Sequence, residues 1–264
     1  MERLRPRFKA SLKSAWFALA PYRPLASDRA SILMYHSIAE NGRFFTVSPP
    51  VFERQMAYLR ARRVPVITLA ALLERLAAGE PAGGTVVITF DDGYADNYEQ
   101  AFPVLRRYGF PATIFLVPNA SDRTASLPRL SRAQLGEMLD SGLITIEPHS
   151  LTHPHLPSLP PEAVRREIVG SKAAVERLTI RVCRCFAYPY GDYDEMTASV
   201  VRDTGFIGAV TVKEGLVSAK SDLYRLPRNA VDSATSPAEF RGKVSTAIGC
   251  YVAVKAWVQP LAYV

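Results

Sequence analysis

The chain of 264 residues is long enough to bury a full hydrophobic core as one large domain or two small ones. Apolar residues make up 48% of the sequence and charged residues 22%, as in an ordinary soluble globular protein, and no stretch of about eighteen consecutive apolar residues predicts a transmembrane helix. The net charge of +7 does not indicate nucleic-acid binding, because basic and acidic residues are balanced outside the N-terminal segment and no stacking-aromatic motif is present.

The N-terminal segment, residues 1–30, carries seven basic residues against Glu2 and Asp28. Its apolar residues recur at helical spacing: Leu4, Phe8, Leu12, Trp16 and Leu19. This pattern predicts a basic amphipathic helix that rests on an anionic membrane surface. A plain structural helix and an export signal are the alternatives, and the apolar run "AWFALA" is shorter than the core of a normal signal peptide.

The three cysteines are odd in number, and Cys183 and Cys185 lie too close in sequence for a good disulfide. They favour free thiols in a reducing compartment. We therefore expect a cytoplasmic protein with peripheral contact to the inner membrane, and the sequence leaves its oligomeric state open.

Apolar runs bounded by turn residues alternate with helical patterns along the rest of the chain. Strands are predicted at residues 31–36, 64–69, 85–90, 112–117, 143–150, 185–191 and finally 208–212. Helices are predicted at 49–63, 70–79, 97–109, 131–142 and 160–178. This alternation predicts an α/β fold with a parallel sheet or barrel, in a single domain over residues 31–235.

A C-terminal helix is predicted over residues 236–264. Ser236 is suited to cap its N-terminus, with Pro237 at the first helical position and Glu239 three residues after the cap. Pro260 is expected to end this helix.

Several residues capable of chemistry fall at predicted strand ends, where βα proteins bind their ligands. They are His36 after "ILMY", Asp91 and Asp92 after "TVVITF", His149 after "LITIEP", and the "YPYG" segment. Adjacent carboxylates repel each other and cost free energy to desolvate. A metal ion or two distinct catalytic roles would explain the pair, and so would a solvated turn.

A second group is the His-x-x-x-His pair of His149 and His153. This spacing predicts two imidazoles on one side of a helical turn, close enough to share a cation. Two histidines and one carboxylate leave coordination positions open for water and substrate. His155, which follows closely, is expected to be a loop residue without a catalytic role.

The motifs "TFDDG", "HSLTH" and "FAYPYG", in this order, resemble those of the NodB-type polysaccharide deacetylases, carbohydrate esterase family four, over about residues 31–232. The resemblance implies a distorted (β/α) barrel, and a hydrolase that removes N-acetyl groups from an amino sugar in a polysaccharide or lipid-linked glycan, as in exopolysaccharide biosynthesis. It also implies a divalent cation, with Zn²⁺ ahead of Co²⁺, Ni²⁺, Fe²⁺ and Mn²⁺.

Carried over by position, the resemblance makes Asp91 the base that activates metal-bound water. Asp92, His149 and His153 match the metal ligands, and Tyr190 matches the residue whose backbone N–H binds the oxyanion. Ser150 and Thr152 are expected to brace the ligand turn.

The sequence departs from the family pattern in three places. Ala187 stands where the family has an arginine that orients the base, and we expect Arg228 to replace it. An Asp/Trp motif has no clear match, and no histidine follows His155 to supply the usual Leu-x-His. If the barrel is permuted, as in members resembling poly-N-acetylglucosamine deacetylases, His36 in "LMYH" takes the position of the general acid.

These departures leave two other functions open. One is hydrolysis of a different non-peptide amide on the same fold. The other is a catalytically inactive module that binds carbohydrate or membrane, which would be expected to have lost part of the ligand set.

Overall fold

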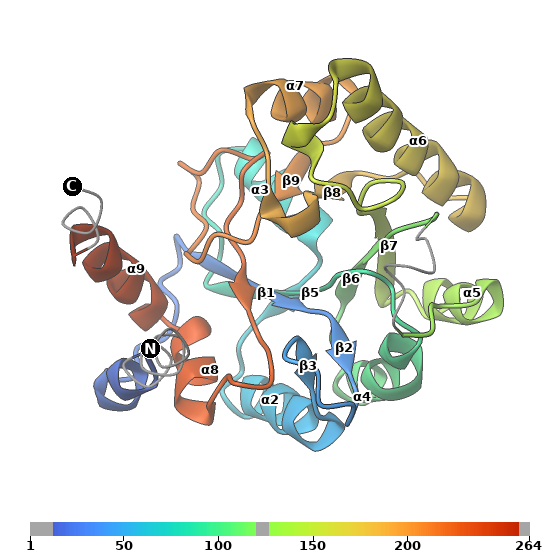
Figure 1. Cartoon of the computed structure of the whole chain (residues 1–264). Coiled ribbons are helices and arrows are strands. Elements are labelled where there is room, and N and C mark those ends of the chain that lie inside the picture. The colour runs from blue at the N-terminus through green and yellow to red at the C-terminus, as the bar shows by residue number, and fades with distance from the viewer. Residues whose placement is uncertain (1–12, 120–126, 259–264) are drawn as a thin grey trace, which may run out of the picture.

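A computed structural model describes residues 13–119 and 127–258 of the chain (Figure 1). The strands are β1 (Ala30–Tyr35), β2 (Ser37–Ile38), β3 (Thr46–Val47), β4 (Val66–Ile67), β5 (Thr85–Phe90), β6 (Ala112–Leu116), β7 (Ile144–Pro148), β8 (Cys185–Ala187), β9 (Gly208–Val210) and β10 (Asn229–Ala230). The α-helices are α2 (Pro49–Ala61), α3 (Leu69–Ala77), α4 (Phe102–Tyr108), α5 (Arg132–Asp140), α6 (Pro161–Thr179), α7 (Glu195–Asp203), α8 (Pro237–Lys243) and α9 (Ala247–Val258). Residues 13–19 are also helical.

The main sheet is parallel throughout and has the order β10-β1-β5-β6-β7, with β4 also paired to β5. Every residue of β1 and β5 is buried, because apolar side chains cover both faces of these central strands. The pairing of Tyr35 with Phe90 at the strand ends aligns the following residues, His36 and Asp91. The sheet thus brings chemically active residues from distant parts of the sequence to one edge.

The strands β8 and β9 form a second parallel pair. The buried carboxylate of Glu147 in β7 connects this pair to the main sheet by accepting hydrogen bonds from the backbone N–H groups of Arg184 (2.8 Å) and Cys185 (2.9 Å).

The two sheets enclose a common interior. One buried cluster contains residues from five strands, namely Ile32, Val87, Phe115, Cys185 and Val210, together with four leucines of α3. Figure 1 shows helices α2, α4, α5, α6 and α7 around the outside of the strands. The prediction of an α/β fold with a parallel sheet in a single domain is confirmed.

Helix boundaries follow the local signals in the sequence. Ser131 and Gln134 form the predicted capping box at the start of α5. Ser236 caps α8 by accepting a hydrogen bond from the Glu239 N–H at 3.2 Å. The helix predicted at 97–109 begins with a π-helical turn, Asn97–Ala101, and ends at Gly109 in the left-handed conformation.

Three expectations were wrong. The strand at 208–210 is followed by β10, and α7 lies where no helix was predicted. The single C-terminal helix expected over 236–264 is two helices in its described part, α8 and α9. The break comes at residues 244–246, where the Ser245 hydroxyl hydrogen-bonds to the Gly242 carbonyl and to the Ala247 N–H. Pro260 lies outside the described residues.

The predicted amphipathic helix at the N-terminus is described from residue 13 onward, so Leu4, Phe8 and Leu12 lie outside the described residues. Phe17 is buried against α9, whereas Leu19 is 86% exposed. All three cysteines are free thiols. In the described part of the chain, no helix is both long and apolar enough to cross a bilayer.

Candidate active site

The centre of the candidate site is an ion pair between Asp91, directly after β5, and Arg228, directly before β10. The guanidinium donates from Nη1 to Asp91 Oδ1 at 2.6 Å and from Nη2 to Oδ2 at 2.7 Å. It also donates to the Thr211 carbonyl at 2.8 Å and to Thr89 Oγ1 at 3.2 Å. Arg228 is fully buried, so its position is fixed on every side. The expectation that Arg228 reaches the base position therefore agrees with the geometry.

The surroundings of Asp91 keep it ionised. Burial by itself opposes ionisation, but Arg228, His149 and His36 together hold the pKa of Asp91 well below its ordinary value. The Asp91 Oδ2 atom lies 3.9 Å from His149 Nε2. Asp91 is thus an ionised carboxylate that Arg228 holds in a fixed orientation next to His149.

A candidate metal-binding group lies next to this ion pair. One ligand atom each from Asp92, His149 and His153 lies within 4.8 Å of the others. His153 Nε2 is 3.7 Å from Asp92 Oδ1. His149 Nδ1 is 2.8 Å from the Ala187 carbonyl, an arrangement in which Nδ1 donates and Nε2 keeps its lone pair for a cation.

The donor set fits a divalent cation. Burial lowers the pKa of His149, and burial together with the neighbouring His149 lowers the pKa of His153. Both imidazoles are therefore neutral near pH 7 and can serve as ligands. The hydrogen bonds that Arg228 donates to a carboxylate go to Asp91 and not to Asp92. The two adjacent aspartates have different partners.

The loop that carries both histidines is not the helical turn that their spacing predicts. Residues 149–155 are non-helical, and Ser150 and His153 have φ of 59° and 63°. Ser150 Oγ accepts a hydrogen bond from the His153 N–H at 2.9 Å. Glu167 of α6 accepts hydrogen bonds from the Leu151 and Thr152 N–H groups, both at 2.9 Å, and from the Thr152 hydroxyl. The bracing roles expected of Ser150 and Thr152 agree with these contacts.

The turn after β5 also has an unusual backbone. Asp92 and Gly93 both have positive φ, 74° and 68°. A Cβ atom on Gly93 would lie 2.4 Å from the end of the Leu116 side chain, so a larger residue would have to displace that side chain and adopt a positive φ as well.

Two residues that sequence reasoning missed support Asp92. Arg129 donates a hydrogen bond to the Asp92 carbonyl and lies over the ring of Tyr94, 4.6 Å from its centroid. Burial and a hydrogen bond to Asp92 raise the pKa of Tyr94, so it remains a neutral donor. Tyr94 directly follows "TFDDG" and could have been noticed, whereas no local pattern marks Arg129.

The ring of Tyr190 lies against the histidine loop. It is 4.5 Å from the His153 ring and stacks on the His155 ring at 3.9 Å, and His155 Nδ1 is 2.6 Å from Asp192 Oδ2. Tyr190 has a φ of 58°. The following Gly191 cannot carry a Cβ, which would lie 2.7 Å from the Val212 nitrogen. The role of the Tyr190 backbone N–H as an oxyanion donor stays a prediction.

His36 directly follows β1, whereas His149 directly follows β7. In the sheet, β1 and β7 lie on opposite sides of β5, the strand that ends at Asp91. His36 is partly exposed, contacts the Phe45 ring, and contributes to the lowered pKa of Asp91. The Asn97 side chain donates to its carbonyl at 2.7 Å, which fixes its backbone. His36 is therefore close enough to Asp91 to influence its ionisation, and its role as the general acid stays a prediction.

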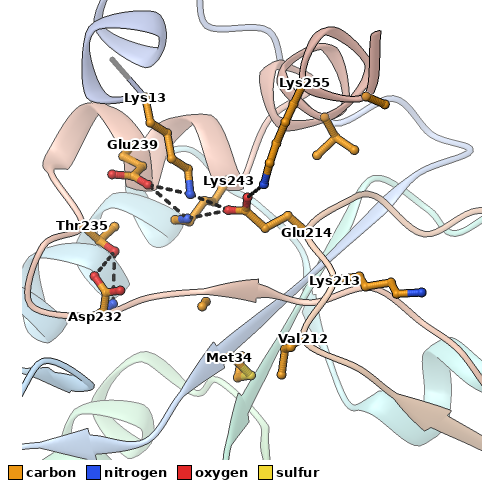
Figure 2. A pocket seen from close by; sticks show the side chains of 13 residues that line it. Lys13, Met34, Val212, Lys213, Glu214, Asp232, Thr235, Glu239, Lys243 and Lys255 are labelled. Atoms are coloured by element: carbon orange, nitrogen blue, oxygen red, sulfur yellow. Dashed lines mark hydrogen bonds and ion pairs between the residues drawn. The ribbon is translucent and has the colours of Figure 1, made fainter. Parts of the chain in front are cut away.

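A cavity of about 600 Å³ extends over β10 to the terminal helices, and none of the candidate site residues lines it (Figure 2). Met34 of β1, two residues before His36, and Ala230 of β10, two residues after Arg228, contribute to its lining. Lysine and glutamate side chains from the loop after β9 and from the terminal helices complete the lining.

Comparisons with known proteins agree with this arrangement. A family model described as polysaccharide deacetylase matches residues 78–209. The Bacillus subtilis (strain 168) protein YxkH, whose name assigns it to the polysaccharide deacetylases, is 34% identical over 210 residues, which cover 79% of this chain and 74% of that protein. The poly-β-1,6-N-acetyl-D-glucosamine N-deacetylase of Staphylococcus epidermidis is 30% identical over 203 residues, covering 72% of this chain and 69% of that one.

Among solved structures, IcaB from Ammonifex degensii superposes with a TM-score of 0.74 at 26% identity, and the match covers 84% of this chain and 97% of that chain. The family model and the relatives both include the strand that delivers Asp91 and Asp92. The chain belongs to the polysaccharide deacetylase family.

Proposed function

We propose that this protein is a metal-dependent N-deacetylase that removes acetyl groups from the N-acetylated amino sugars of a glycan. The observation that carries the proposal is the division between two adjacent carboxylates. Asp92 lies among two neutral imidazoles, and Asp91 is engaged on both oxygens by Arg228. The Staphylococcus epidermidis relative is named for poly-β-1,6-N-acetyl-D-glucosamine, which supports this polymer as the substrate class.

Asp92, His149 and His153 would hold the cation. Two imidazoles and one carboxylate are a common donor set of catalytic zinc sites, so Zn²⁺ is the metal that we propose. When bound, such a cation lowers the pKa of water and polarises the acetyl carbonyl.

Asp91 would act as the general base, taking the proton of the attacking water. Its carboxylate is ionised, because Arg228 outweighs the cost of its burial. The two hydrogen bonds from Arg228 also fix the plane of the carboxylate, so Arg228 is a positioning residue for the base. Arg228 thereby supplies the guanidinium beside the base that Ala187 lacks. Because this part of the catalytic machinery is retained, an active deacetylase is favoured over an inactive module.

His36 would protonate the departing amine, and the backbone N–H of Tyr190 would stabilise the oxyanion. An amine leaves poorly as an anion, so a proton donor near the site accelerates this step. In related reactions, one preorganised N–H donor at the oxyanion lowers the activation free energy by about 3 kcal/mol.

Acetate release from β-1,6-linked N-acetylglucosamine oligomers tests the proposal. The purified protein is assayed as prepared, after treatment with a chelator, and after addition of Zn²⁺, Co²⁺, Ni²⁺, Mn²⁺ or Fe²⁺. We expect activity that the chelator abolishes and a divalent cation restores. Full activity of the metal-stripped protein would contradict metal dependence. Release of acetate or formate only from other amides would favour a different substrate.

A further inference from the structure

The helical segment 13–19 and helix α9 lie side by side at one edge of the molecule (Figure 1). Phe17 is only 3% exposed, and it packs with Ala247 and the fully buried Ile248 of α9. Its ring lies 5.3 Å from the Tyr251 ring. The two segments thus form one packed unit, although they come from opposite ends of the chain.

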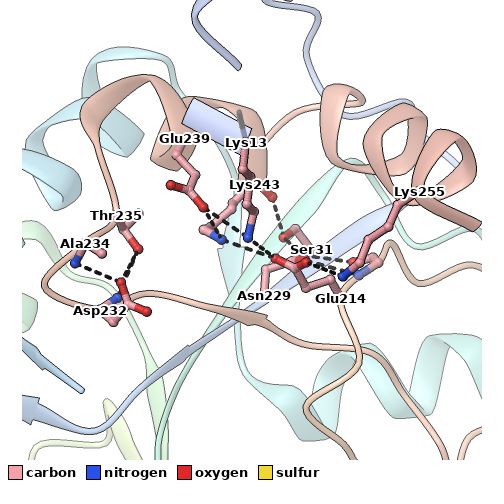
Figure 3. Close-up of polar contacts among 11 residues, drawn as sticks. Lys13, Ser31, Glu214, Asn229, Asp232, Ala234, Thr235, Glu239, Lys243 and Lys255 are labelled. Atoms are coloured by element: carbon pink, nitrogen blue, oxygen red, sulfur yellow. Dashed lines mark hydrogen bonds and ion pairs between the residues drawn. The ribbon is translucent and has the colours of Figure 1, made fainter. Parts of the chain in front are cut away.

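A cluster of ion pairs fastens this unit to the catalytic domain (Figure 3). Its members are Lys13, Glu214 from the loop after β9, Glu239 and Lys243 of α8, and Lys255 of α9. Lys243 is 1% exposed and lies 3.5 Å from Glu214 and 3.4 Å from Glu239. Breaking one of these pairs would leave a buried charge without its partner, which costs free energy. The ion pairs therefore hold the terminal helices in a defined position on the domain.

The outer side of this unit is apolar. A groove of about 430 Å³ between the two segments is lined mainly by apolar side chains, including Trp16 and Leu19, and also by Cys250. Cys250, Val254 and Trp257 follow one another at helical spacing along one face of α9. Val254 is 43% exposed and Trp257 is 81% exposed. We name Leu19, Cys250, Val254 and Trp257 the terminal apolar surface.

A helix in contact with water normally has polar residues on its outer side. The sequence of α9, AIGCYVAVKAWV, has Lys255 as its single charged residue. Contiguous exposed apolar surface of this kind is typical of an interaction site. We therefore expect a binding partner or a lipid surface to cover the terminal apolar surface.

We propose that the terminal apolar surface docks on an anionic lipid bilayer. The residues that precede the described part, 1–12, contain the basic residues Arg3, Arg5, Arg7 and Lys9 and one acidic residue, Glu2. Basic residues next to an apolar helix face favour an interface rich in anionic lipid headgroups. An exposed tryptophan such as Trp257 is suited to the headgroup region.

Helix α9 has 12 residues, or about 18 Å at 1.5 Å per residue, and is too short to cross a hydrocarbon core of about 30 Å. It would lie in the plane of the interface. A second copy of the chain is the other occupant that such a surface could take, and self-association is therefore one outcome of the test.

Flotation of the full-length protein with lipid vesicles tests the proposal. Vesicles of phosphatidylcholine alone are compared with vesicles that also contain phosphatidylglycerol. We expect binding to the anionic vesicles and binding weaker by about tenfold or more to the neutral ones, with high salt reducing the difference. The variant Leu19→Asp/Trp257→Asp should bind the anionic vesicles at least about tenfold more weakly, because both side chains lose their apolar contact with lipid.

The matched control is Ile180→Asp/Val182→Asp. These two residues are 82% and 76% exposed in the loop that follows α6, outside the terminal helices. The control should bind vesicles like the unchanged protein, and both double variants should keep the circular dichroism and melting temperature of the unchanged protein. Equal binding by Leu19→Asp/Trp257→Asp, or no binding to either vesicle, would overturn the proposal. Self-association that this variant abolishes, without vesicle binding, would instead assign the surface to a second copy.

Discussion

Arg228 and Asp91 form a two-pronged ion pair, at 2.6 and 2.7 Å, between residues 137 positions apart in the sequence. The pair is buried, and the guanidinium is held by Thr211 and Thr89 as well. In this chain, the residue directly before the short strand β10 supplies the cation beside the base, and Ala187, at the family's arginine position, contributes its backbone carbonyl, which orients His149.

Arg228→Lys tests whether orientation of Asp91 matters. Lysine keeps a positive charge but cannot hold both carboxylate oxygens in a fixed plane. We expect kcat to fall by about tenfold to a hundredfold with little change in KM, because the altered group is buried away from bound substrate. Steady-state acetate release measures both constants. The control is Arg225→Lys, which changes an arginine that pairs with Glu195 near the surface and should leave both constants unchanged. A rise in KM alone would contradict the positioning role.

Asp91→Asn and Asp92→Asn should separate base from ligand. We expect Asp91→Asn to lose about a thousandfold in activity while binding Zn²⁺ almost as the unchanged protein does, since its side chain is not in the donor set. Asp92→Asn should weaken Zn²⁺ binding, because an amide is a poorer ligand than a carboxylate. Calorimetric titration with Zn²⁺ measures the affinity, and thermal unfolding verifies that each variant is folded at the assay temperature. Equal loss of Zn²⁺ affinity in both variants would argue against this division.

His36→Gln should affect substrates according to their leaving groups. If His36 protonates the amine, the variant should lose about a hundredfold in kcat on N-acetylated sugars. Hydrolysis of an activated aryl acetate, whose leaving group needs no proton, should change far less. Parallel assays on the two substrates measure this ratio. A uniform loss on both substrates would indicate that His36 only supports the structure.

Acid should weaken the attachment of the terminal helices. Burial opposes ionisation of Glu214, but Lys13, Lys243 and Lys255 outweigh it and lower the pKa of this carboxyl below its ordinary 4.5. A carboxyl with a lowered pKa in the folded state stabilises the fold above its unfolded pKa, and this contribution is lost as the pH falls through the folded value. We therefore expect loosening of residues 13–19 below about pH 4.5.

Trp16 fluorescence in a Trp257→Phe background measures this loosening, because these are the only two tryptophans of the chain. Glu214→Gln should lower stability at neutral pH by about 1–3 kcal/mol and show a smaller change on acidification. The exposed pair of Glu53 and Arg107 offers the control Glu53→Gln, which should keep the acid response. An unchanged acid response in Glu214→Gln would assign the effect to other carboxylates.

Much of the fold could be predicted from local patterns. The apolar run of β5, the capping box at Ser131 and the alternation of strands and helices depend on neighbouring residues, so their signals are contained in short windows. The placement of Asp91 and Asp92 at a strand end followed from the same pattern. Where the pattern was weak, prediction failed: β10 has only two residues, and the break between α8 and α9 depends on hydrogen bonds of Ser245.

The sequence by itself determined which residues stand at the strand ends and which of them could bind a metal ion. Only the tertiary structure decided which other residues these side chains contact. Arg228 reaches Asp91 because β10 pairs with β1 and β1 with β5, and no local pattern records that order. The bent loop around His149 and His153 likewise depends on Glu167 from α6. The identity of a side chain is local information, whereas its partner depends on the packing of strands and helices far apart in the chain.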